Sequence, residues 1–332
     1  MGTVELAAIA KSQEDSMKKI STAELKKAIL AVEAERLKHP ATFRPDRAQR
    51  AALQKSRKAS EKIVSGFLKK AGLDKKNFQA LQEQRGVKLE RMIAKHKTDA
   101  LRLASRQKDT LFSSIATRSK ALGDLASRSD FFPYPTFTLD TPFFIGSMSG
   151  IDISDSVAVP FGSWAKFKFS TSQSGTQKVA FYFYWTNPFQ EYAVINAATD
   201  MEAAGYLKAH GPWAFFGMNF SSVHATALFS LYGSAGPVAV TAHASAWLGG
   251  CGAVGEVIGD DTEGTSILSG VSLNTTMFPV APGDVVVFEV ALALDYENDS
   301  GDIEADFETG DFKIACPVVV FSLLNSPPGA MA

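Results

Sequence analysis

The order of apolar and polar residues divides the chain near residue 130 into a helical part and a β part. In the helical part, Ser21 and Glu24 have the spacing of a capping box, in which each side chain bonds a free amide at a helix start. Leu25 and Ile29 then recur at helical spacing, and Pro40 ends the element. The pattern predicts a first helix between Ser21 and Pro40.

Two further helices are predicted before residue 130. One runs from Pro45 to near Gly72, and the longest runs from Lys75 to about Arg128, weakened at Gly86. Its apolar residues have heptad-like spacing in two stretches that are out of register with each other, so a coiled coil, a three-helix bundle and a hairpin all fit. The predicted assembly interface consists of Leu89, Ile93, Leu103, Leu111, Ile115, Leu122 and Leu125.

Beyond residue 130 the pattern changes to short β-type runs separated by turn residues. Val285–Leu294 and Val318–Leu324 are unusually apolar, which is typical of strands buried on both faces. Residues 303–307 alternate apolar and acidic, which predicts one face in a core and one in water. We expect an antiparallel β-sandwich of the jelly-roll type, with Ala197–His210 as a short helix or loop excursion.

The predicted fold class is therefore α+β with several domains, an N-terminal helical bundle or coiled-coil segment followed by a jelly-roll-like antiparallel β-sandwich. The boundaries follow the change in composition. The predicted parts are a flexible N-terminus (1–20), a basic helical segment (21–130), a Pro- and aromatic-rich connector (131–150), an acidic β-sandwich (151–326) and a C-terminal tail (327–332).

Charge is divided at the same boundary. Residues 1–130 hold 29 of the 34 Lys and Arg and 15 of the 35 Asp and Glu, a net charge of +14, whereas residues 131–332 carry −15. All four Trp also lie in the second part. Such opposed charges favour contact between copies of the chain, although a cationic surface also attracts polyanions.

Three functions fit these features. The first is a structural or binding protein that is not an enzyme and assembles into a homo-oligomer through a helical stalk and a β-sandwich head. The second is a capsid-like assembly protein whose basic half binds nucleic acid or another polyanion. The third is a lectin-like or receptor-binding head that takes a glycan or cell-surface ligand.

Sites with specific chemistry are weakly indicated. Asp295, Glu297, Asp299 and Asp302 form an acidic loop whose oxygens could bind calcium, but the loop departs from the EF-hand pattern, and no other cofactor is predicted. Histidines 210, 224 and 243 share the β part with many serines, yet no nucleophile motif accompanies them. Cys251 and Cys316 are expected to be small buried residues, with a disulfide as the alternative.

The sequence predicts neither a transmembrane helix nor a signal peptide, so we expect a soluble protein. Its compartment is left open: the cytoplasm, export by a non-classical route, or a particle. In layout alone, helices before a β-sandwich head are similar to C1q/TNF-like assemblies, viral fibre heads and capsid proteins with a basic arm.

Overall fold

The computed structural model describes residues 21–38, 66, 70, 75–126, 134–147, 151–212, 219–233, 240–255 and 260–325. Within these ranges lie two long helices, α2 (Thr22–Lys38) and α4 (Lys75–Ala126), and thirteen strands. The first predicted helix is confirmed together with its capping box, because the Ser21 amide donates to the Glu24 carboxylate (3.0 Å) and the Glu24 amide to the Ser21 hydroxyl (3.2 Å). The helix predicted from Pro45 to Gly72 falls largely outside the described residues.

The strands form two antiparallel sheets packed face to face, which confirms the predicted β-sandwich. Sheet A contains β1 (Thr136–Leu139), β3 (Asp152–Val157), β4 (Trp164–Thr171), β6 (Ala193–Gly211), β9 (Asp261–Val280), β11 (Asp302–Phe307), β12 (Lys313–Ala315) and β13 (Val319–Leu323). Sheet B contains β2 (Phe144–Ser147), β5 (Gly175–Thr186), β7 (Asn219–Gly233), β8 (Val240–Gly255) and β10 (Val285–Asn298).

The core lies between the sheets, where alternate residues of each strand meet. Phe167 and Phe307 of sheet A stack at 5.0 Å between ring centroids, and Phe288 of sheet B stacks on Phe321 of sheet A at 5.4 Å. Strand β10 is buried on both faces over Val285–Leu294, as its mostly apolar run predicts. The second face of β10 is covered because α2 packs there.

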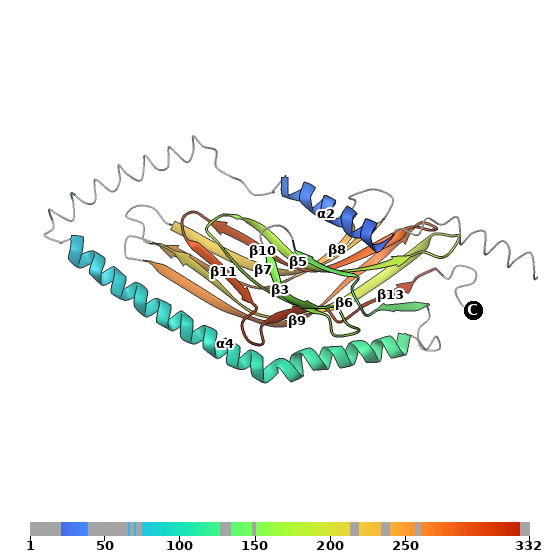
Figure 1. Ribbon diagram of the computed structural model, residues 1–332, viewed down its shortest axis with the longest axis horizontal. Coiled ribbons are helices and arrows are strands. Elements are labelled where there is room, and N and C mark those ends of the chain that lie inside the picture. Colours follow the sequence, from blue (N-terminus) through green and yellow to red (C-terminus); the bar gives the residue numbers. More distant parts are fainter. Residues whose placement is uncertain are drawn as a thin grey trace, which may run out of the picture.

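Each helix covers the outer face of one sheet, on opposite sides of the sandwich (Figure 1). Leu25 and Ile29 of α2 pack on sheet B beside Tyr182 and Val287. Ala100 and Ala104 of α4 pack on sheet A against a cluster made of Ala204, Tyr206 and Phe312. The expectation of a helical bundle or coiled coil is therefore not supported, because the apolar side chains described on both helices pack on the sheets rather than on another helix.

Two segments differ from the sequence-based expectation. Ala197–His210 lies within β6, the central strand of sheet A, and is neither a helix nor a loop excursion. It is extended because β9 pairs with one of its edges while β11, β12 and β13 pair with the other, and these ladders override the helix preference of its Ala, Met and Leu residues. The segment described as a connector contributes β1 to sheet A and β2 to sheet B.

Candidate functional site

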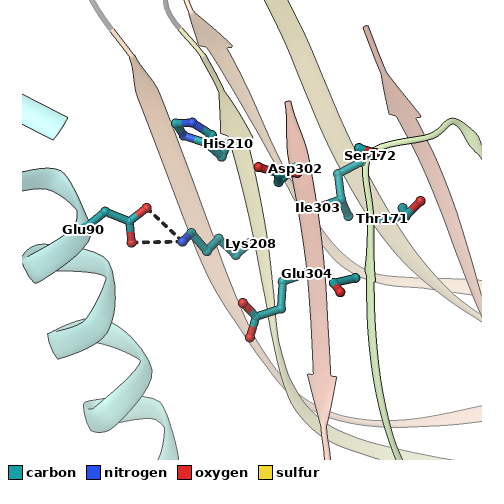
Figure 2. A pocket seen from close by; sticks show the side chains of 9 residues that line it. Glu90, Thr171, Ser172, Lys208, His210, Asp302, Ile303 and Glu304 are labelled. Carbon is teal, nitrogen blue, oxygen red and sulfur yellow. Dashed lines mark hydrogen bonds and ion pairs between the residues drawn. The ribbon is translucent and has the colours of Figure 1, made fainter. Parts of the chain in front are cut away.

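A polar groove lies between α4 and the outer face of sheet A. Its volume is about 630 Å³, and it is lined by Glu90, Ser170, Thr171, Ser172, Lys208, His210, Asp302, Ile303 and Glu304. The floor comes from three neighbouring strands in fixed register. His210 of β6 stands opposite Asp302 of β11, and Lys208 stands opposite Glu304, which in turn faces Ser170 of β4. Figure 2 shows Asp302 between His210 and Ser172.

Residues of α4 close one side of the groove. Both carboxylate oxygens of Glu90 accept from the Lys208 ammonium group at 2.9 Å (Figure 2). Two turns further along, Lys97 donates to Glu304 at 2.9 Å and to Asp306 at 2.6 Å. Lys208 belongs to sheet A and Glu90 to α4, so their ion pair joins the helix to the sheet across the groove.

The contacts of Lys97 determine the ionisation of two carboxyl groups on β11, the strand beneath α4. Burial of Asp306 tends to raise the pKa of its carboxyl group, but hydrogen bonds from Lys97, from Thr309 and from the Glu308 amide outweigh it and lower the pKa to about 2. Burial also tends to raise the pKa of the Glu304 carboxyl group. The hydrogen bond from Lys97 and the positive charges of Lys97 and Lys168 outweigh this effect and lower the pKa. Both carboxylates are therefore held in the charged form.

A tight turn at residues 298–301 positions Asp302. The Asn298 side chain accepts from the Gly301 amide (2.6 Å) and donates to the Gly301 carbonyl (2.5 Å). The Ser221 hydroxyl lies 2.8 Å from the Asn298 side-chain oxygen and 2.9 Å from the His210 carbonyl, so it joins the turn to β6. The turn thus places the first residue of β11 directly beside His210.

Several polar groups in the groove are left with hydrogen-bonding capacity. His210 bonds Thr262 through Nδ1 (2.9 Å), which leaves its Nε2 available to a ligand. Among the described residues, the Asp302 carboxylate and the hydroxyls of Ser170 and Ser172 make no hydrogen bond or ion pair. This arrangement presents donors and acceptors on a rigid floor.

The four calcium candidates do not share one site. Asp302 lines the groove on sheet A, whereas Asp295 and Glu297 lie on β10 of sheet B, where Asp295 accepts from the Thr176 hydroxyl (2.7 Å). Asp299 lies in the turn between β10 and β11. Within the described parts of the chain, no group of three or more His, Cys, Asp or Glu side chains is arranged to hold a metal ion.

The histidines also lie apart. His210 is on sheet A, while His224 of β7 and His243 of β8 are exposed on sheet B. In the groove, Asp302 stands between His210 and Ser172, whereas a hydrolytic triad needs the histidine between the serine and the acid (Figure 2).

The predicted assembly residues are divided by the docking of α4. Leu89 and Ile93 are half-buried, and Ile93 packs beside Ala100 against sheet A. Leu103 is 44% exposed and is not part of the cluster that packs on sheet A. The remaining four, Leu111, Ile115, Leu122 and Leu125, lie on α4 in a part whose side chains are outside the described residues. Their role in self-association stays a prediction.

Of the groove residues, the sequence singles out Asp302 as a calcium candidate and His210 as a histidine with no nucleophile motif beside it. Lys208 was missed, as was the position of His210 on the same face of β6, because the segment was expected to be helical and a helix does not have the alternation of a strand. The alternation of residues 303–307 predicts that Glu304 lies on an acidic face in water. That face is covered instead, because α4 lies over it and Asp306 is fully buried.

No protein-family model matches the chain. A search of curated proteins gave no match either. Among the described residues, neither helix is long and apolar enough to cross a membrane.

Solved structures that are similar to part of this chain include three carbohydrate-binding modules. The module TmCBM61 in complex with β-1,4-galactotriose is 6% identical over 54% of this chain and 87% of its own, with a TM-score of 0.22. The family 11 module of a Clostridium thermocellum cellulosomal cellulase is 10% identical over 59% and 99%, with a TM-score of 0.23. A β-1,3-glucan-binding family 6 module from Bacillus halodurans is 9% identical over 55% and 96%, with a TM-score of 0.20. Similarities this low support no inference about the ligand of this chain.

Proposed function

We propose that the protein is a binding protein that holds a hydroxyl-rich ligand, such as the terminal sugars of a glycan, in the groove between α4 and sheet A. The observation that carries the proposal is the set of groups on the groove floor with unused hydrogen-bonding capacity: the Asp302 carboxylate, the Ser170 and Ser172 hydroxyls and the Nε2 of His210. Sugar hydroxyls both donate and accept, so they can satisfy all four groups at once.

The charge of the groove supports a neutral or cationic ligand over an anionic one. Lys208 is already paired with Glu90, and Glu304 is paired with Lys97. Asp302 is left as the uncompensated charge among the lining residues. A phosphate or sulfate group placed there would be repelled, whereas a hydroxyl group can donate a charge-assisted hydrogen bond to Asp302.

The same groups support binding without catalysis. Hydrolysis of a glycosidic bond needs a carboxylic acid whose pKa is raised so that it can protonate the leaving group. Glu304 has the opposite environment, because Lys97 and Lys168 lower its pKa. We therefore propose that a bound glycan leaves the groove unchanged, and incubation with labelled oligosaccharides followed by chromatography should return intact substrate.

A glycan array probed with the full-length protein tests the proposal, followed by calorimetric titration of the strongest ligand. Asp302→Asn should weaken binding roughly 10- to 100-fold, since hydrogen bonds to a charged group contribute about 1.5–3 kcal/mol. Asp155→Asn is the matched control, because Asp155 is an exposed carboxylate on the edge strand β3, outside the groove. Absence of any bound glycan, or equal affinity of the Asp302 variant and the wild type, contradicts the proposal.

A further inference from the structure

Helix α4 has two opposite faces of different chemistry. The face on sheet A contains Ile93, Lys97, Ala100 and Ala104, spaced four, three and four residues apart. The outward face carries Lys88, Arg91, Lys95, Arg102 and Arg106, all exposed, which we call the basic ridge. At about 100° per residue these five cations lie within an arc of roughly 60°, almost diametrically opposite Lys97 and Ala104.

The basic ridge is not neutralised within the described part of the chain. Within the described residues its one ion pair joins Arg102 to Asp99 at 3.5 Å, and both side chains remain more than half exposed. Lys88 and Arg91, and Arg102 and Arg106, are like-charge neighbours three or four residues apart, and such pairs destabilise a helix. An anionic partner along this face would remove that repulsion.

The shape of the basic ridge favours a linear polyanion. From Lys88 to Arg106 it extends about 27 Å along a straight line of positions, at about 1.5 Å per residue. No aromatic residue lies among the ridge positions, so contacts would be made to a charged backbone and not to stacked bases. We propose that the basic ridge of α4 binds the phosphate backbone of double-stranded nucleic acid without reading its sequence.

Two alternatives fit less well. A second α4 would bring like charges together, which disfavours pairing of two ridges. The acidic surface of a second copy offers carboxylates dispersed over strands of both sheets, such as Asp155 on β3 and Glu297 on β10, instead of a continuous line. The acidic strands beneath α4 do not prevent nucleic acid from binding, because a helix about 10 Å thick separates them from the ridge and the Debye length at physiological salt is about 8 Å.

Fluorescence anisotropy with a labelled 20-base-pair DNA duplex tests the proposal on the full-length protein. Four to five phosphate contacts predict a slope of log K against log salt of about −3.5 to −4.5. Between 50 and 200 mM salt the affinity should then fall roughly 100- to 500-fold. A slope near zero, or no binding at 50 mM salt, overturns the proposal.

Paired variants locate the contact. Lys88→Gln with Lys95→Gln should reduce the magnitude of the slope by about 1.8, because two phosphate contacts are lost. Lys27→Gln with Lys70→Gln removes the same charge from exposed positions outside the ridge and should leave the slope unchanged.

Equal loss of slope in both double variants would show a net-charge effect. A salt-sensitive dimer in light scattering without DNA would assign the ridge to a second copy. Binding to vesicles of anionic lipid but not to the duplex would assign it to a membrane, and each of these results overturns the proposal.

Discussion

Lys97 of α4 and Asp306 of β11 form an ion pair of 2.6 Å that fastens the helical half of the chain to the β-sandwich. Asp306 is completely buried, whereas the Lys97 side chain is 23% exposed. The Thr309 hydroxyl also donates to Asp306 (2.7 Å). A carboxylate enclosed in this way depends on the lysine for charge compensation, since Lys168 is the next cation and lies 4.0 Å away.

Replacing Lys97 with methionine should destabilise the fold by about 2–3 kcal/mol, because it leaves a buried carboxylate without its main cation. Urea unfolding followed by circular dichroism measures the change. Lys95→Met removes an exposed lysine from the same helix and should change the free energy of unfolding by less than about 0.5 kcal/mol. Equal effects of the two substitutions would show that the Lys97 ion pair does not fasten α4.

Acid should weaken the fold through Asp306. Its pKa is lowered from 3.8 to about 2, so the unfolded chain binds the proton more readily than the folded one. The carboxylate therefore contributes about 2 kcal/mol above roughly pH 4, and this contribution is lost as the pH falls toward 2. Asp306→Asn should show a shallower loss of stability between pH 4.5 and 2.5 in denaturant titrations. A slope as steep as that of the wild type would contradict this account.

The sequence predicted the periodic face of α4 but not what the face packs on. Ile93 belongs to the predicted apolar stripe and packs on sheet A, yet heptad-like spacing is the same whether the partner is another helix or a sheet. The small side chains of Ala100 and Ala104 favour close approach of the helix to the sheet, and the paired charges of Lys97 and Asp306 need a strand from the other end of the chain. Contacts so distant in sequence leave no local pattern.

Helix α4 should be sensitive to volume on its inner face. Ala104 is 2% exposed, so Ala104→Leu should force the helix away from sheet A and cost about 1–3 kcal/mol. Leu103, at the preceding position, is 44% exposed, and Leu103→Gln should leave the stability nearly unchanged. Thermal unfolding of the two variants measures the difference. A larger loss from Leu103→Gln would indicate that Leu103 lies in an interface between copies, as the heptad-like spacing predicts.

The sequence did not predict the groove, for a related reason. The alternation of residues 303–307 correctly predicted which side chains of β11 enter the core, so it also fixed the face of Glu304. The other half of the floor comes from β6, whose alanines, Met201 and Leu207 favour a helix. Its strand conformation is imposed by pairing on both edges, and that pairing is a property of the whole sheet and not of the segment.

Gly301 should not tolerate a side chain. A Cβ atom there would collide with the carbonyl oxygen of His210 and the hydroxyl of Ser221, both of which hold the turn beside the groove. Gly301→Ala should therefore cost more than about 3 kcal/mol or prevent folding. Gly252→Ala is the control, since its new Cβ would make only ordinary contacts at 3.4 Å or more. Folding yield and urea midpoint separate the two variants, and equal midpoints would show that the turn can relax.

Both cysteines should be inert in the folded protein. Cys251 and Cys316 are buried and unpaired, and burial raises the pKa of each thiol to about 12. Only the thiolate reacts with disulfide reagents, so almost none is available at pH 8. We expect Ellman's reagent to modify neither residue in native protein within an hour and both after unfolding in guanidinium. Rapid modification of one native thiol would reveal local opening of the sandwich, and Cys251→Ser and Cys316→Ser would identify which strand opens.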